Sequence, residues 1–207
     1  MNTTTTVVLI GVLMRKLVYF VATSIDGFIA DPAGDFSRFP VHQETLASLF
    51  TRYPETCPGH LREALSVTSK PRRFDTVLLG RRSHAPAVEA GLTDGAYPHL
   101  RQIVVTHQDL PESPRVEIMG GDIAARVAEL KDEPGLDIWL CGGGELAAQL
   151  VDLIDEIQLK INPILLGSGI PLFGDGTQPR NLQAIGVEQL PGGINLATYR
   201  TGLEQSR

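Results

Sequence analysis

Short apolar runs along the chain alternate with segments whose apolar residues recur every three or four positions. Uninterrupted apolar runs predict buried β-strands at 17–22, 75–80, 103–106 and 116–119. Amphipathic spacing predicts helices at 42–52 and 122–131, and we also expect a shorter helix at 61–67. Asp122 is the expected N-cap of the second helix. Alternating strands and helices are typical of an α/β domain.

The most informative stretch, Leu136–Leu150, predicts a strand that passes through three glycines directly into a helix. The strand centres on the run 138–140, and Leu146, Leu150, Leu153 and Ile154 share one face of the helix. Gly142, Gly143 and Gly144 have no Cβ, so their N–H groups can face a phosphate or pyrophosphate at the positive end of a helix. The alternative is a tight turn that needs small residues for packing. Three glycines in a row favour the ligand.

The last third of the chain predicts a different arrangement. Residues 156–161 alternate as a strand does, and 163–174 predicts a loop punctuated by glycine and proline. A hairpin follows, with strands at 186–190 and 194–200 joined by Pro191-Gly192-Gly193.

Bulk properties limit the function classes. With 207 residues, we expect a single domain over 14–203, preceded by an extension, 1–13, whose role the sequence does not reveal. A net charge of −6 and a pI of about 5.3 argue against nucleic-acid and anionic-membrane partners. The apolar run 7–14 is shorter than the ~20 residues of a membrane span.

The cysteines and histidines bear on the redox compartment and on metal binding. Cys57 and Cys141 form no CxxC pair, and we expect free thiols in a reducing, cytoplasmic compartment. The five histidines lack HxH or HExxH spacing, so no metal site is predicted.

Two further segments follow predicted strands. Gly80-Arg81-Arg82-Ser83 offers guanidinium groups and a hydroxyl, and is a second candidate for phosphate binding. We expect Ser83 to cap a helix there. Asp26 lies in the loop after the first strand, where it either contributes to an active site or only stabilises a turn.

Taken together, these segments resemble the dihydrofolate-reductase-like superfamily, in particular bacterial reductases related to the C-terminal reductase domain of riboflavin biosynthesis. The resemblance covers about 15–200. It rests on the order and spacing of four segments, namely 24–30, 79–83, 141–146 and 151–173. It implies a three-layer α/β/α fold with a mostly parallel, mixed sheet and the C-terminal antiparallel hairpin, and it implies a homodimer by analogy.

The resemblance also implies NADPH at the carboxyl ends of the strands. Arg81 would face the 2′-phosphate, Ser83 the pyrophosphate, and Thr106 and His107 the adenosine end. Gly142, Gly143, Gly144, Glu145 and Leu146 match the pyrophosphate turn, in which the family has a cis Gly-Gly peptide, here Gly142-Gly143. Independently, no Asp or Glu ends the strand 103–106 to hold a free ribose 2′-hydroxyl, which favours NADPH over NADH.

Departures from the family pattern limit the substrate assignment. Segment 35–44 lacks the signature with which folate reductases orient a pterin, and Phe28 stands where riboflavin-pathway reductases carry a basic residue. We therefore expect an NADPH-dependent oxidoreductase that transfers a hydride to a small pterin- or pyrimidine-like heterocycle. Asp26 is its candidate catalytic residue. The alternatives are a nucleotide-binding protein of the same fold without reductase activity, and an interaction protein whose glycine turn is structural.

Overall fold

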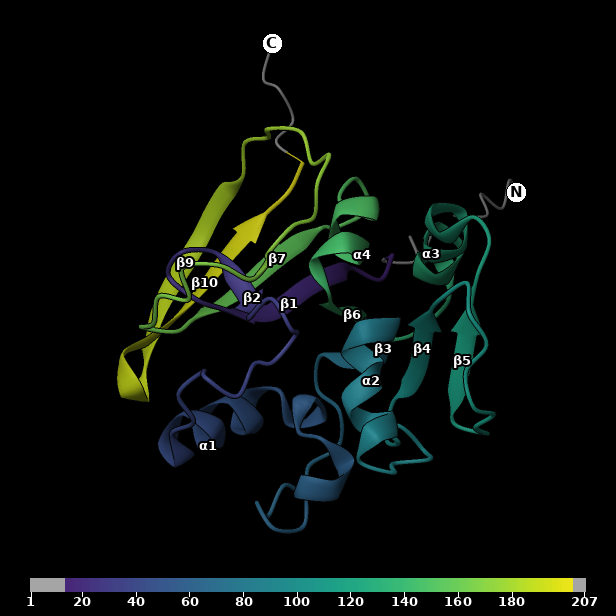
Figure 1. The fold of residues 1–207 in the computed structure, drawn as a ribbon, viewed down its shortest axis with the longest axis horizontal. Coiled ribbons are helices and arrows are strands. Elements are labelled where there is room, and N and C mark those ends of the chain that lie inside the picture. Colours follow the sequence, from purple (N-terminus) through teal and green to yellow (C-terminus); the bar gives the residue numbers. More distant parts are fainter. Residues whose placement is uncertain (1–13, 203–207) are drawn as a thin grey trace, which may run out of the picture.

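The computed structural model describes residues 14–202, so the predicted extension 1–13 and residue 203 lie outside the described residues. An eight-stranded sheet, in the order β5-β4-β3-β6-β1-β7-β10-β9, runs through the molecule (Figure 1). Its strands are β1 (Leu17–Thr23), β3 (Phe74–Gly80), β4 (Arg101–Val105), β5 (Val116–Met119), β6 (Asp137–Gly142), β7 (Glu156–Ile161), β9 (Gln183–Leu190) and β10 (Ile194–Arg200). Six of them, from β5 to β7, pair in parallel, and β10 and β9 add an antiparallel hairpin at one edge.

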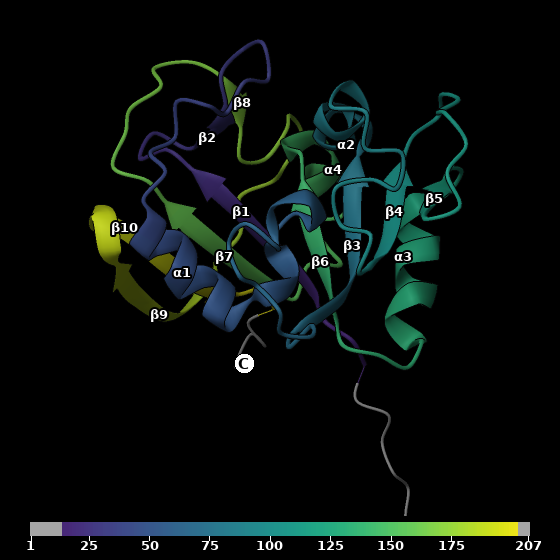
Figure 2. The same cartoon turned by 90° about the horizontal axis from the view of Figure 1, so that it is seen from below.

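Helices cover both faces of this sheet, which confirms the three-layer α/β/α prediction (Figures 1 and 2). The helices are α1 (Gln43–Arg52), α2 (Arg81–Glu89), α3 (Ile123–Asp132) and α4 (Gly144–Gln149). Leu49 of α1 packs in the core on one face with Phe20, Phe74 and Trp139. The buried side chains of α3 and α4 pack on the other face, beside Leu17, Leu78 and Leu140. Asp122 caps α3 as predicted, because its carboxylate accepts the N–H of Ala125 at 3.1 Å.

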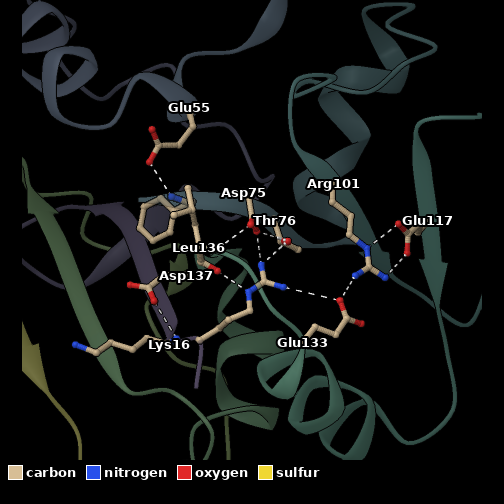
Figure 3. A network of polar contacts seen from close by, with 11 residues as sticks. Lys16, Glu55, Asp75, Thr76, Arg101, Glu117, Glu133, Leu136 and Asp137 are labelled. Carbon is tan, nitrogen blue, oxygen red and sulfur yellow. Dashed lines mark hydrogen bonds and ion pairs between the residues drawn. The ribbon is translucent and has the colours of Figure 1, made fainter. Parts of the chain in front are cut away.

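The amino ends of the central strands are joined by a polar network around the buried Arg15 (Figure 3). Arg15 is 4% exposed, and its guanidinium donates to the Leu136 carbonyl, to Asp75 and, at 2.6 Å, to Thr76. Asp75 also accepts the N–H of Leu136 at 2.7 Å. These contacts connect the start of β1, the start of β3 and the loop before β6. Because Arg15 is buried, it needs such partners to offset the loss of its hydration.

Glu55 is a second buried charged residue, and it binds the backbone at the start of β3. It lies in the 3₁₀ helix η1 (Pro54–Thr56) and is fully buried. Its carboxylate accepts three consecutive backbone N–H groups, from Arg72 at 3.1 Å and from Arg73 and Phe74 at 2.9 Å each. The role of Glu55 has no signal in the local sequence, since its partners lie 17 to 19 residues away.

Two sequence predictions about helices were wrong. Residues 61–67 form no helix. The 3₁₀ helix η2 (Gly59–Leu61) passes into a turn that ends at Ser66, whose φ is +54°. Leu61 and Leu65, two apolar residues of this segment, are 40% and 38% exposed and do not pack in a core.

The helix after the glycines is also shorter than expected. It ends at Gln149. Leu150 and Leu153 lie in turns and Ile154 lies in the irregular segment before β7, although Leu150 and Ile154 are buried. The loop predicted at 163–174 contains a short strand, β8 (Ile170–Pro171), which pairs with β2 (Phe28–Ala30) in a separate two-stranded sheet.

We expect Glu55→Ala to lower the free energy of unfolding by about 3 kcal/mol, because three backbone N–H groups lose a charged acceptor inside the protein. Urea denaturation followed by circular dichroism measures this loss. The exposed Glu63 provides the control, and Glu63→Ala should change stability by less than about 0.5 kcal/mol. Equal losses for the two variants would contradict the role assigned to Glu55.

Candidate nucleotide-binding site

Two of the predicted segments meet at the carboxyl ends of neighbouring strands. β3 and β6 pair in parallel, with Leu79 opposite Gly142, so the segments that follow them leave the sheet at the same edge. A Cβ added to Gly80 would lie 3.5 Å from the Gly142 carbonyl oxygen, and one on Gly143 would lie 3.8 Å from the Ser83 hydroxyl oxygen. Residues about 60 positions apart in the sequence thus form one surface.

The three glycines of the turn meet different constraints. A Cβ on Gly144 would lie 2.2 Å from the Pro171 carbonyl oxygen, so this position is closed by packing against the segment 170–174. Gly142 has a φ of +114°, which favours glycine, and its peptide bond to Gly143 is cis, as the resemblance implied. A Cβ on Gly143 would meet only ordinary contacts, at 3.6 Å or more. Packing therefore accounts for Gly144, whereas it does not require a glycine at position 143.

The segment after β3 begins helix α2. Gly80 is its N-cap residue and makes no side-chain cap, so the prediction that Ser83 caps this helix was wrong. Ser83 lies in the first turn instead, half-buried, beside Gly143. Arg81 is exposed, and among residues 14–202 its side chain makes no ion pair or hydrogen bond. Its guanidinium is thus available to an anion.

Arg82 and Glu145 connect the two segments at the surface. Their side chains form an ion pair of 3.5 Å between Nη1 and Oε1, with 69% and 74% of the side chains exposed. A pair so exposed contributes little to stability. Leu146, the next residue of α4, is buried in the core and holds the turn on the sheet.

Thr106 and His107 follow β4, on the far side of β3 from the glycine turn. Thr106 is buried, and its hydroxyl accepts the N–H of Gln108 at 3.0 Å while its own N–H donates to the Met119 carbonyl at 3.1 Å. It therefore fixes the turn after β4. His107 is exposed at the same edge.

Asp26 links two loops. Its carboxylate accepts the N–H groups of Leu166 at 3.1 Å and Gly167 at 2.7 Å. The Ser24 hydroxyl, with help from these two N–H groups, lowers the pKa of Asp26 from 3.8 to about 2. Asp26 is thus ionised at neutral pH and is not a proton donor there. The catalytic role of Asp26 stays a prediction. Its contacts with Leu166 and Gly167 are compatible with a role in positioning the loop.

A hollow of about 610 Å³ lies between the loops that Asp26 joins. Its lining residues are Asp31, Pro32, Arg38, Ile164, Leu165, Leu166 and Ser168. A small heterocycle fits such a volume. The sequence analysis gave no role to Arg38 or Ser168, because neither stands in a motif and they come together only in the folded chain.

Among residues 14–202 no three His, Cys, Asp or Glu side chains are grouped so as to hold a metal ion. None of the helices in that range has the length and apolar character needed to span a membrane. Cys57 and Cys141 are free cysteines, as predicted.

Comparison with known proteins agrees with this geometry. Residues 15–196 match the RibD C-terminal domain family, so the chain belongs to this family. Among curated relatives, the uncharacterized protein YwjB of Bacillus subtilis (strain 168) is 27% identical over 191 residues, which are 90% of this chain and 98% of YwjB.

Solved structures share the fold. Dihydrofolate reductase from Enterococcus faecalis, complexed with NADP(H) and RAB-propyl, matches with a TM-score of 0.56 and 15% identity over 89% of this chain and 95% of that chain. A diaminohydroxyphosphoribosylaminopyrimidine deaminase/5-amino-6-(5-phosphoribosylamino)uracil reductase from Thermotoga maritima matches with a TM-score of 0.57 and 17% identity, over 90% of this chain and 56% of that chain. The predicted dihydrofolate-reductase-like fold is therefore confirmed.

The Asp26 contacts predict acid-sensitive loops. Because the folded pKa of Asp26 lies below its ordinary value, the contacts stabilise the loops above about pH 4 and are lost as the pH falls towards 2. Hydrogen exchange should show protected amides at Leu166 and Gly167 that lose protection over this range, and Asp26→Asn should weaken the protection at pH 7. As a control, Asp35→Asn should leave these amides protected, since Asp35 bonds only within its own loop. Unchanged protection in Asp26→Asn would contradict the assigned link.

Proposed function

We propose that this protein is an NADPH-dependent reductase that transfers a hydride to a small pterin- or pyrimidine-like heterocycle. The observation that carries the proposal is the convergence of the segment 80–83 with the glycine turn at one edge of a parallel sheet. Ligands of open α/β sheets bind outside the carboxyl ends of the strands. The family and the fold support a reductase as well, because the structural relatives include a uracil reductase and a dihydrofolate reductase complexed with NADP(H).

The residues at this edge fit a dinucleotide with an extra phosphate. Arg81, exposed and without a protein partner among the described residues, would bind the 2′-phosphate as a bidentate cation. The Ser83 hydroxyl and the turn at Gly142 and Gly143 would hold the pyrophosphate. Thr106 and His107 would border the adenosine. NADPH supplies the hydride when bound, and the protein supplies orientation and exclusion of water.

The substrate would enter between the loops that Asp26 joins. The hollow there offers Arg38 and Ser168 as polar contacts and Ile164, Leu165 and Leu166 as apolar ones. Such a lining suits a flat ring that carries a few polar groups. Asp26, as an anion, would hold the loop 164–168 in place.

The alternative is a nucleotide-binding protein without reductase activity. The sequence 35–44, which leads into α1, lacks the acid-containing signature of folate reductases. Asp26, the remaining acidic candidate, is engaged with backbone N–H groups and has a lowered pKa. These two observations favour the alternative, and the turnover experiment distinguishes it from a reductase.

The homodimer and the cytoplasmic location also stay proposals. Sedimentation velocity tests the first: a single species of twice the 22.4 kDa chain mass supports it, and a species of one chain mass contradicts it.

Arg81→Ala should weaken NADPH binding by about 10- to 100-fold, because a charge-assisted contact to the 2′-phosphate is worth about 1.4 to 2.8 kcal/mol. NADH lacks this phosphate, so its affinity should change by less than about threefold. Calorimetry in a phosphate-free buffer measures both. Arg200→Ala, an exposed site on β10 opposite Glu156 at the amino end of β7, is the control and should change neither affinity. An equal loss for both cofactors upon Arg81→Ala would remove the 2′-phosphate assignment.

Turnover separates the reductase from the alternative. NADPH oxidation, followed at its absorbance maximum in the near ultraviolet, should accelerate when oxidised pteridines or aminopyrimidines are added to the protein. The same mixtures without protein give the background. Tight NADPH binding without oxidation by any of these compounds would favour the nucleotide-binding protein.

A further inference from the structure

Lys160 of β7 is a half-buried cation without a partner. Among residues 14–202 its ammonium group makes no ion pair and no hydrogen bond. Lys131, by contrast, is 7% exposed, and its ammonium group binds the Asp155 carboxylate at 2.7 Å and the Leu153 carbonyl at 3.0 Å. A cation taken out of water for a structural role requires such partners. The ammonium group of Lys160 is therefore left free to act on a ligand.

The order of the strands places Lys160 towards the nicotinamide end of the proposed cofactor site. The proposed contacts follow β4, β3 and β6 in turn, from the adenosine end at Thr106 to the pyrophosphate turn at Gly143. The next strands of the sheet are β1 and β7, so the nicotinamide would extend over their carboxyl ends (Figure 1). Neighbouring strands lie about 4.8 Å apart, so Lys160, two strands beyond β6, is about 10 Å from the turn across the sheet. A ribose and a nicotinamide ring span such a distance.

Lys160 lies on the face of the sheet that α1 covers. It is the penultimate residue of β7, and it pairs with Ala22 of β1 and Leu196 of β10. Paired residues share a face of the sheet, and Leu196 belongs to the same core cluster as Leu49 of α1. The loop that follows β7 supplies Ile164, Leu165, Leu166 and Ser168 to the hollow proposed for the substrate. The expected positions of nicotinamide and substrate thus meet at this end of β7.

Burial lowers the pKa of Lys160 from the ordinary value of 10.5. Ala22 and Leu196, which flank it, carry no titratable group. The titratable groups of the surrounding elements on this face are His42 and Glu44 at the start of α1, Arg52 at its end, Glu156 on β7, Glu188 on β9 and Arg200 on β10. Arg52 and Glu188 bind each other, Glu156 binds Arg73, and the other three are exposed. A lysine with a lowered pKa is a stronger acid than one in water.

We propose that Lys160 is the proton donor of the reductase, an inference that rests on the proposed function. The reduction of a ring C=N bond consumes a hydride and a proton. The ring carbon receives the hydride from NADPH and forms a C–H bond, and the electron pair of the C=N bond moves to the nitrogen. The nitrogen takes a proton from the Lys160 ammonium group, which becomes a neutral amine and regains a proton from water. Asp26 does not supply this proton, because it is ionised at neutral pH.

NADP⁺ and 2′-phospho-ADP-ribose test the place of Lys160 as matched probes, since only NADP⁺ carries the nicotinamide. The full chain, labelled with ¹³C at the ε-carbons of its four lysines, is titrated with each probe and followed by NMR. Both probes should shift the amide signals of Ser83 and Gly143, but only NADP⁺ should shift the Lys160 signal. An unmoved Lys160 signal beside shifted amides would overturn the role of Lys160 alone. If neither probe moves any signal, the nucleotide site fails and the proton donor with it.

Turnover tests the proton transfer itself, with the oxidised pteridines and aminopyrimidines named above as substrates. Lys160→Met should lower kcat about 100-fold or more, the usual contribution of a general acid, and leave the affinity for NADPH within threefold. Lys160→Arg keeps the cation but cannot release its proton at these pH values, so it should be equally impaired. Lys70→Met, an exposed site, should keep full activity.

The pH profile separates proton donation from a structural role. The unchanged chain should be active while Lys160 is protonated and lose activity as the pH rises through its folded pKa, below 10.5, and Lys160→Met should lack this limb. Full activity in Lys160→Met or in Lys160→Arg would overturn the proposal. Absence of turnover in the unchanged chain would remove the reductase as well, and the NMR comparison on that chain remains decisive if the variants do not fold.

Discussion

The glycine turn after β6 is held in place by direct contact between backbones, and the proposed nucleotide site depends on this contact. The Pro171 carbonyl oxygen occupies the space that a Cβ on Gly144 would need, and Gly174 donates its N–H to the Gly144 carbonyl at 2.9 Å. The Tyr19 hydroxyl of β1 also fixes the segment 170–174, because it donates to the Leu172 carbonyl at 2.7 Å. With the turn so fixed, Gly143 faces Ser83 across the edge of the sheet.

The same segment also connects the two proposed binding regions. Leu172 donates its N–H to the Gly27 carbonyl at 2.9 Å, and the pairing of β2 with β8 and the Asp26 contacts continue this link. The loop 24–30 is therefore tied to the glycine turn through residues 164–174. The proposed substrate and cofactor would therefore bind to loops that are hydrogen-bonded to the same segment, 164–174.

Polar groups are distributed differently at the two ends of the sheet. At the amino end, Arg15 and Glu55 are buried and fully engaged with backbone and side-chain partners (Figure 3). At the carboxyl end, Arg81 and His107 are exposed. Buried, satisfied polar groups rigidify a structure, whereas exposed ones remain available to ligands. The polar groups at the amino end thus stabilise the sheet, whereas those at the carboxyl end remain available to a ligand.

Features that depend on local sequence could be predicted, and those that depend on distant contacts could not. The strands of the eight-stranded sheet and the Asp122 cap follow from short patterns, and the structure confirms them, whereas β2 and β8 lie in segments where no strand was predicted. The helix predicted at 61–67 was wrong, because the local sequence cannot show that Leu61 and Leu65 have no core to pack on. The three glycines left packing and ligand binding as alternatives, and only the contact with Pro171, 27 residues further on, shows that packing requires Gly144. The hollow beside Asp26 also combines segments far apart in the chain, so no local signal could have shown it.

Calorimetric titration of the purified chain with NADPH and with NADH, in a buffer without phosphate, would test the nucleotide site. We expect one NADPH site per chain and an affinity for NADH at least tenfold lower, the discrimination expected from a single phosphate contact. Failure of both cofactors to bind would leave the fold unchanged but would contradict the nucleotide site, and the glycine turn would then serve packing alone.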